Sequence, residues 1–281
     1  MKSSIRLLAG ACALILSTLT AAAQVYLGSD NFNDNNLSNW GGQYSVGGTN
    51  AGTLTNINDR LEFTNTGGSV QTRVVMWNNV ANASYTEDWT QSVTATNTTT
   101  PATGFSLMGI QVFSAPAEYG YVGLYVYRSA IQGTKIIFEK GKTDGVSWTS
   151  ASYASLQADT TDVFLAISFN STTKDLTLGY SLDGGATFNA DYLVVNPNTP
   201  VVSSFGNEVE AGAWQAAPTD GFSFRILGKS TEVAIGSGIL YADDFAVSAG
   251  QTAIPEPSTY AALAGLGALG LAFWQRRRKA A

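Results

Sequence analysis

The stretch Tyr119-Gly-Tyr-Val-Gly-Leu-Tyr-Val-Tyr-Arg128 has tyrosine at four of its five odd-numbered positions and aliphatic residues at three of its five even-numbered positions. Successive side chains of an extended strand point to opposite faces, so Tyr119, Tyr121, Tyr125 and Tyr127 fall on one face. The aliphatic residues between them fall on the other. This alternation predicts a β-strand with one aliphatic and one tyrosine-rich face. The tyrosine face suits sugar rings, which offer CH patches for stacking and hydroxyls for hydrogen bonds. A tyrosine-lined sheet interior would give the same pattern.

The rest of the chain from Gln24 to Ala253 repeats this two-residue alternation between turns rich in Gly, Asn and Asp. No long amphipathic helix competes with it, so the domain is predicted to be all-β. The number of strands favours a two-sheet jelly-roll sandwich over a small immunoglobulin-like sandwich, and no repeat of blade length supports a propeller. The expected strands are 60–65, 69–77, 85–96, 104–113, 119–128, 134–140, 162–170, 174–182, 192–195, 221–227 and 239–247.

Charge and residue content exclude several function classes. Between the two chain ends lie nine basic and twenty acidic residues, a net charge of −11. A surface this acidic repels phosphate backbones, so no nucleic-acid partner is expected. The chain has no histidine, and its one cysteine is Cys12. A domain from 24 to 253 therefore has no Ser-His-Asp triad, thiolate nucleophile or ordinary zinc site, and any metal needs oxygen ligands.

The N-terminus reads as a cleaved signal peptide. Lys2 and Arg6 give a positive start, Leu7 to Leu16 is apolar, and Ala21 to Ala23 supply the small residues that a signal peptidase needs. We expect residues 1–23 to form a signal helix that is removed. The protein is then exported.

The C-terminal segment, Ile254 to Ala281, contains an uncharged run from Tyr260 to Trp274 that ends at a basic cluster. We expect a short transmembrane helix at about 259–275, with the cluster on the cytoplasmic side. The cluster consists of Arg276, Arg277, Arg278 and Lys279. A buried core helix is the alternative, which four consecutive basic residues disfavour.

The tripeptide Pro255-Glu256-Pro257 precedes the apolar run. This order of tripeptide, span and terminal basic cluster resembles the PEP-CTERM sorting signal of Gram-negative bacteria that make exopolysaccharide. The resemblance covers the last 28 residues and implies an exosortase-type membrane enzyme as partner. It further implies a membrane-anchored precursor and a product at the cell surface or outside the cell, with exopolysaccharide as a candidate partner.

Two short segments, Asp30-Asn31-Phe32-Asn33 and Tyr241 to Val247, resemble the first and last strands of concanavalin-like lectin and glucanase sandwiches. There the terminal strands pair, and nearby acids hold calcium. The resemblance implies Asp30, Asp243 and Asp244 as candidate calcium ligands, and oxygen-rich side chains suit this ion. The alternative is that these residues are solvated turn and edge residues. No other cofactor is indicated.

No catalytic residue is predicted. Concanavalin-like glycoside hydrolases carry a Glu-x-Asp-x-x-Glu cluster, which this sequence lacks. Ser181 to Phe188 fits a single Asp-box pattern and is interpreted as a hairpin turn. We therefore expect a structural or glycan-binding protein of the cell surface or extracellular matrix, and not an enzyme. The alternative is a carbohydrate-active hydrolase that uses paired carboxylates.

Overall fold

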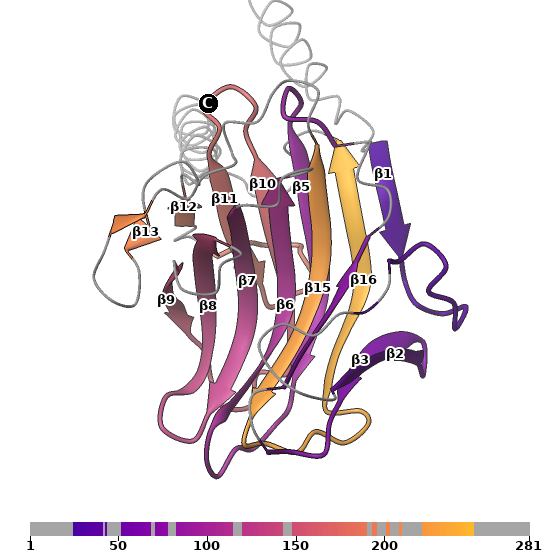
Figure 1. Ribbon diagram of the computed structural model, residues 1–281, viewed down its shortest axis with the longest axis vertical. Coiled ribbons are helices and arrows are strands. Elements are labelled where there is room, and N and C mark those ends of the chain that lie inside the picture. Colours follow the sequence, from indigo (N-terminus) through magenta and orange to yellow (C-terminus); the bar gives the residue numbers. More distant parts are fainter. Residues whose placement is uncertain are drawn as a thin grey trace, which may run out of the picture.

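The computed structural model describes two antiparallel β-sheets. It covers residues 25–41, 43, 52–68, 71–77, 83–114, 120–142, 148–189, 193–195, 201–202, 208–209 and 221–249. In Figure 1 the long strands of both sheets run roughly along the long axis of the domain. The sequence-based prediction of an all-β, two-sheet domain is confirmed.

The six-stranded sheet has the order β4-β15-β6-β7-β8-β9. The strands β6, β7, β8 and β9 pair in sequence order as hairpins. The strand β15, which comes near the C-terminal end of the domain in sequence, lies between β4 and β6. The bounds are β4 Gln71–Met76, β6 Phe105–Ser114, β7 Gly120–Ser129, β8 Gly133–Lys142, β9 Trp148–Ser155 and β15 Phe222–Thr231.

The eight-stranded sheet has the order β12-β11-β10-β5-β16-β3-β2, and β1 pairs with β16 off this path. Figure 1 shows β1 beside β16 at one margin of the domain, with β2 and β3 below it. A small separate sheet joins β13 and β14. The bounds are β1 Val25–Asp30, β2 Thr53–Ile57, β3 Arg60–Thr64, β5 Trp89–Asn97, β10 Asp162–Phe169, β11 Leu176–Ser181, β12 Leu193–Val195, β13 Val201–Val202, β14 Glu208–Val209 and β16 Leu240–Ala249.

All eleven predicted strands overlap a strand of the structure. The prediction missed β1, β2 and β9, together with the two-residue strands β13 and β14. It was also wrong at Asn31–Asn33, which follow β1 as a turn with a positive φ of 54° at Phe32. The carboxylate of Asp30 accepts a 2.8 Å hydrogen bond from the Phe32 amide, and this contact closes the turn.

The core lies between the sheets and contains two groups of aromatic rings. Trp40 meets Trp77 and Phe245 at centroid distances of 5.0 and 4.8 Å. A second group surrounds Trp89, whose ring lies 4.9 Å from Phe224. Such pairs add about 0.5–1.5 kcal/mol beyond the area they bury. The aliphatic face of β7 packs into the same core, since Val122, Leu124 and Val126 are fully buried there.

A β-bulge at Asp243 and Asp244 keeps β16 in phase with this core. Leu240 and Ala242 are buried, and after the bulge the buried positions become Phe245 and Val247. Because the side-chain period is two, one extra residue is needed for both pairs to face inward. Asp244 takes it up with a φ of 52°.

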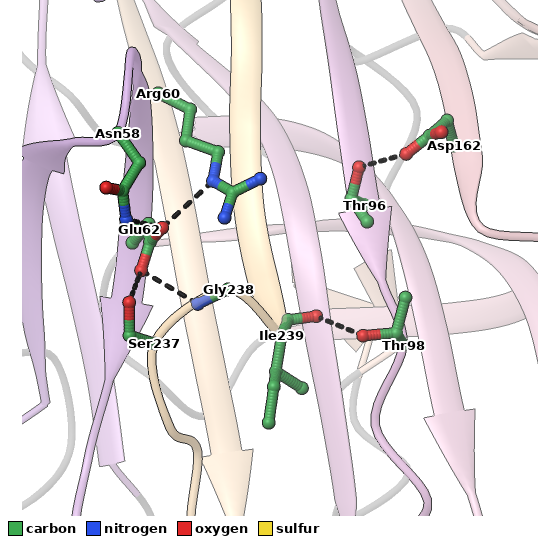
Figure 2. A network of polar contacts seen from close by, with 9 residues as sticks. All are labelled: Asn58, Arg60, Glu62, Thr96, Thr98, Asp162, Ser237, Gly238 and Ile239. Carbon is green, nitrogen blue, oxygen red and sulfur yellow. Dashed lines mark hydrogen bonds and ion pairs between the residues drawn. The ribbon is translucent and has the colours of Figure 1, made fainter.

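Polar contacts tie β3 to the loop before β16 (Figure 2). Glu62 is buried and accepts hydrogen bonds from Asn58, Arg60, Ser237 and the amide of Gly238, at 2.6–3.1 Å. Burial alone would raise the pKa of Glu62. The bonds from Ser237, Asn58, Arg60 and Gly238 outweigh it and hold that pKa below its usual value.

The predicted signal helix 1–23 and sorting tail 254–281 lie outside the described residues. Within the described residues no helix has the length and apolar character needed to cross a bilayer.

Glu62→Gln is expected to lower the free energy of unfolding by about 1–3 kcal/mol near pH 7. Both carboxylate oxygens of Glu62 accept hydrogen bonds, and in the variant the NH2 group of the amide takes the place of one of them. The lowered pKa means that the charge of Glu62 stabilises the fold above the unfolded pKa of about 4.3, and that this contribution is lost as the pH falls through the folded pKa. Urea unfolding should therefore show that the difference in the free energy of unfolding between wild type and variant shrinks below about pH 4. Glu87→Gln, at an exposed residue, is the control. A difference that grows on acidification would contradict the assignment.

Candidate functional site

The tyrosines of β7 lie on the outer face of the six-stranded sheet, the face turned away from the main core. Tyr125 and Tyr127 belong there to a second, smaller apolar cluster with Leu107 and Leu227. Tyr121 and Tyr127 are partly exposed. Tyr119 lies outside the described residues, so three of the four predicted platform residues are placed, and they share a face as the alternation predicted.

Tyr125 departs from the predicted platform because it is fully buried. Its ring lies along the sheet over Gly123, where any side chain would collide with the phenol oxygen. Gln111 donates a 2.7 Å hydrogen bond to this oxygen, and Glu139 shares another with it. Register places Gln111, Gly123 and Glu139 opposite one another on β6, β7 and β8. Tyr125 therefore joins Gln111 to Glu139 through its hydroxyl, and its buried ring offers no surface on which a sugar could stack.

Both acidic groups of this row hold their protons more tightly than in water. Burial, followed by the nearby charge of Glu139, raises the pKa of Tyr125 well above its usual value. Burial also raises the pKa of Glu139, although the charge of Lys229 and the bond to Tyr125 oppose this shift. Tyr125 therefore stays neutral at ordinary pH.

Two similar units of one cation and two rings flank the polar row. In one, Arg225 lies 3.7 Å from the ring centroid of Phe113, and Phe113 stacks on Tyr121 with centroids 5.3 Å apart. In the other, Lys229 lies 5.4 Å from the centroid of Phe105, which stacks on Tyr127 at 5.4 Å.

We call these the Arg225 unit and the Lys229 unit. Phe105 and Phe113 are eight residues apart on β6, which is roughly 27 Å along an extended strand. The outer face therefore offers aromatic contacts at two ends of a long row.

The charge of Lys229 acts on Glu139 across this face. Their strands, β15 and β8, are separated by β6 and β7. On a flat sheet that separation is roughly 14 Å. Lys229 nevertheless lowers the pKa of Glu139, so its positive charge is felt across the strands between them.

A polar pocket of about 420 Å³ lies where β1 meets β16. Its lining residues are Ser29, Asp30, Asn31, Asp34, Asn39, Asp244, Phe245 and Ala246. Two of the predicted calcium ligands, Asp30 and Asp244, thus share a pocket, which Asp34 joins.

Asp243 is not among the pocket residues. It lies opposite Thr94 of β5, and burial, partly offset by the bond from the Asp244 amide, raises its pKa.

Asp30 has a structural task in this pocket. One of its oxygens closes the turn at Phe32, and the other accepts a 2.7 Å hydrogen bond from the indole of Trp40. Within the described ranges no three acidic side chains gather closely enough to hold a metal ion. Asp30, Asp243 and Asp244 are therefore not a ready-made ligand set, and the calcium site stays a prediction.

The predicted turn at Ser181 to Phe188 has the expected internal bonds. Asp183 accepts bonds from the hydroxyls of Ser181 and Thr187, both at 2.5 Å, and these bonds lower its pKa to about 2. Its carboxylate is used within the hairpin.

Sequence reasoning missed Gln111, Glu139, Arg225 and Lys229 as members of the tyrosine face. Gln111, Glu139 and Arg225 lie within predicted strands, and Lys229 lies on β15 two residues beyond the predicted end at 227. All four are in phase with the apolar residues of the second cluster. The missing information was the strand register, which no local pattern supplies.

The C-terminal segment matches a known sequence family. Residues 253–278 match the family described as PEP-CTERM protein-sorting motif. The chain therefore carries this motif. No curated protein matches the chain by sequence.

Among solved structures, the fold is similar to the CBM2 module of the Lactobacillus casei BL23 phage J-1 evolved Dit. The TM-score is 0.50 at 8% identity, and the match covers 80% of this chain and 95% of that one. An endo-1,3-beta-glucanase from Streptomyces sioyaensis gives 0.48 at 11% identity, covering 81% and 97%. A legume lectin-like domain from Entamoeba histolytica gives 0.44 at 10% identity, covering 82% and 100%. Of these three structures the first reaches a TM-score of 0.50, and at 8% identity its likeness to this chain concerns the fold alone.

Asp30→Ala is expected to lower the free energy of unfolding by about 1–3 kcal/mol, because the buried Trp40 indole loses its acceptor. Thermal unfolding followed by tryptophan fluorescence would measure it. Asp34→Ala is the matched control, since Asp34 lines the same pocket but caps only the exposed amide of Asn36. Equal losses in the two variants would argue against a special role for Asp30.

Proposed function

We propose that this chain, which carries a PEP-CTERM protein-sorting motif, is an exported glycan-binding protein of the cell surface or extracellular matrix. The motif indicates a secreted protein that is anchored in the membrane before processing, and it implies an exosortase as processing partner. The binding domain would be a jelly-roll sandwich. Its ligand would be a polysaccharide outside the cell.

The observation that carries the proposal is the make-up of the outer face of the six-stranded sheet. Two stacked aromatic pairs lie at its ends, and Tyr121 and Tyr127 keep part of their rings exposed. Sugar rings pack their CH faces against such side chains and direct their hydroxyls at polar neighbours. The burial of Tyr125 removes one ring from the predicted platform, and it supplies instead a rigid floor between the two pairs.

A face with two separated aromatic contacts favours a long ligand over a single sugar. A ligand that touches both units spans roughly 27 Å of sheet. Each contact would be weak by itself, and joining two on one chain raises the overall affinity through effective concentration. This arrangement suits a protein that holds a matrix polymer.

The hydrolase alternative needs two carboxylates on one cleft. On the described part of the outer face Glu139 is the one acidic side chain, and it is bonded to the buried Tyr125. This observation favours binding over hydrolysis at this face.

Tyr127→Ala is expected to weaken binding of a polysaccharide about tenfold, which corresponds to roughly 1.4 kcal/mol, because half of an exposed stack is lost. The measurement is a glycan array with the full chain in mild detergent, followed by titration of the strongest ligand. Tyr241→Ala removes a partly exposed tyrosine from the other sheet and should leave the affinity unchanged. A flat array would overturn the proposal.

A further inference from the structure

The two sheets differ sharply in charge. Of the nine basic residues between 24 and 253, seven lie on strands of the six-stranded sheet, against one of the twenty acidic residues, Glu139. The seven are Arg73, Arg128, Lys135, Lys140, Lys142, Arg225 and Lys229. The strands of the eight-stranded sheet carry one basic residue, Arg60, and five acidic residues. An acidic domain has therefore collected its cations in one layer.

Three of these cations, Lys135, Arg225 and Lys229, lie on the outer face. Register places Lys229, Leu107, Tyr127 and Lys135 in one row across four strands. The partly exposed Tyr127 thus lies next to Lys135 and is separated from Lys229 by Leu107, and both lysines are partly exposed. Arg225 is buried against Phe113 and adds positive potential from beneath the surface.

Protection of a sheet edge does not explain these lysines. Lysine often marks edge strands, where it discourages pairing with another chain. In this sheet the edges are β4 and β9, whereas Lys135 and Lys229 lie on the interior strands β8 and β15. Cross-strand neutralisation explains at most one of them, since the charge of Lys229 acts on Glu139. Their neighbours in the row are Leu107 and Tyr127, and the face has Glu139 as its one acid among the described residues.

We propose that the outer face of the six-stranded sheet binds an anionic polysaccharide whose sugar rings carry carboxylates. This inference rests on the proposed glycan-binding function and adds the charge of the ligand. The sugar ring stacks on Tyr127 and Phe105, while carboxylates meet Lys135 on one side and Lys229 on the other. The acidic remainder of the domain repels the same polymer, so binding is confined to this face.

The make-up of the face and the charge of the domain argue against a nucleic acid or a membrane as the occupant. The partly exposed lysines lie in one row with the half-buried ring of Tyr127, which fits a single narrow chain. The net charge of −11 outside the chain ends opposes the broad contact that a duplex or a lipid surface makes.

The test is biolayer interferometry with the full chain in mild detergent on three immobilised probes: polygalacturonate, a neutral β-1,3-glucan and double-stranded DNA. Polygalacturonate is expected to bind at least about tenfold more tightly than either of the others. Raising the salt from about 50 to about 300 mM should weaken that binding, because the partly exposed lysines are screened.

Matched variants assign the effect to the face. The double variant Lys135→Gln and Lys229→Gln should lose about tenfold or more of polygalacturonate affinity, whereas the double replacement by arginine should keep it. Lys174→Gln removes one of the two basic residues between 24 and 253 that are not on strands of the six-stranded sheet, and it should leave the affinity unchanged. Melting temperatures of all variants separate lost binding from lost folding.

Each other outcome has a defined meaning. Equal, salt-independent binding of the neutral glucan would overturn the charge inference and leave the proposed function standing. DNA binding as tight as polygalacturonate would overturn the choice of a glycan. Binding of none of the three would count against both.

Discussion

The pairing of β16 is the constraint on which the rest of the sandwich depends. This strand lies between β5 and β3 and also pairs with β1, so the first and last strands of the domain are joined through it. The bulge at Asp243 and Asp244 keeps both halves of the strand facing the core. Without it, Phe245 would leave the aromatic group around Trp40, and the loop that Asp30 fixes would lose its contact surface. The pairing of the first and last strands and the packing of the core therefore depend on the same strand.

The sheet that contains the closing strands differs in its side chains from the six-stranded sheet. The eight-stranded sheet contains β1 and β16, the chain termini of the domain, and most of the acidic strand residues. The six-stranded sheet sends its aliphatic side chains to the core, as Val122 and Leu124 do, and turns a mixed aromatic and basic face outward. Its outer residues are held by one another: Gly123 makes room for Tyr125, and Gln111 and Glu139 hold the phenol in place. The proposed ligand would therefore meet a face whose side chains are already held in place.

The sequence predicted the fold class and most strands because alternation is a local property. It failed where alternation is weak, as in β9, whose Ser- and Ala-rich residues carry no apolar period, and in β1, where a register shift at Gly28 interrupts the pairing. The tyrosine face was predicted from β7 alone. The burial of Tyr125 could not be, because it depends on side chains from β6, β8 and β15 that are distant in sequence. Segregation of charge between the sheets has the same origin, since β15 reaches its place beside β6 only through the topology. The calcium ligands were chosen by nearness to the terminal strands, and the bulge directs Asp243 away from the pocket that Asp30 and Asp244 line.

The central claim is that the ligand lies on the outer face of the six-stranded sheet and not on the opposite, eight-stranded sheet. Hydroxyl-radical footprinting of the full chain, with and without polygalacturonate, locates the contact at the level of side chains. The account predicts that oxidation of Phe105 and Tyr127 falls when the polymer is present, while that of Tyr241 on the opposite sheet is unchanged. Protection of Tyr241, with Phe105 and Tyr127 unprotected, would contradict it.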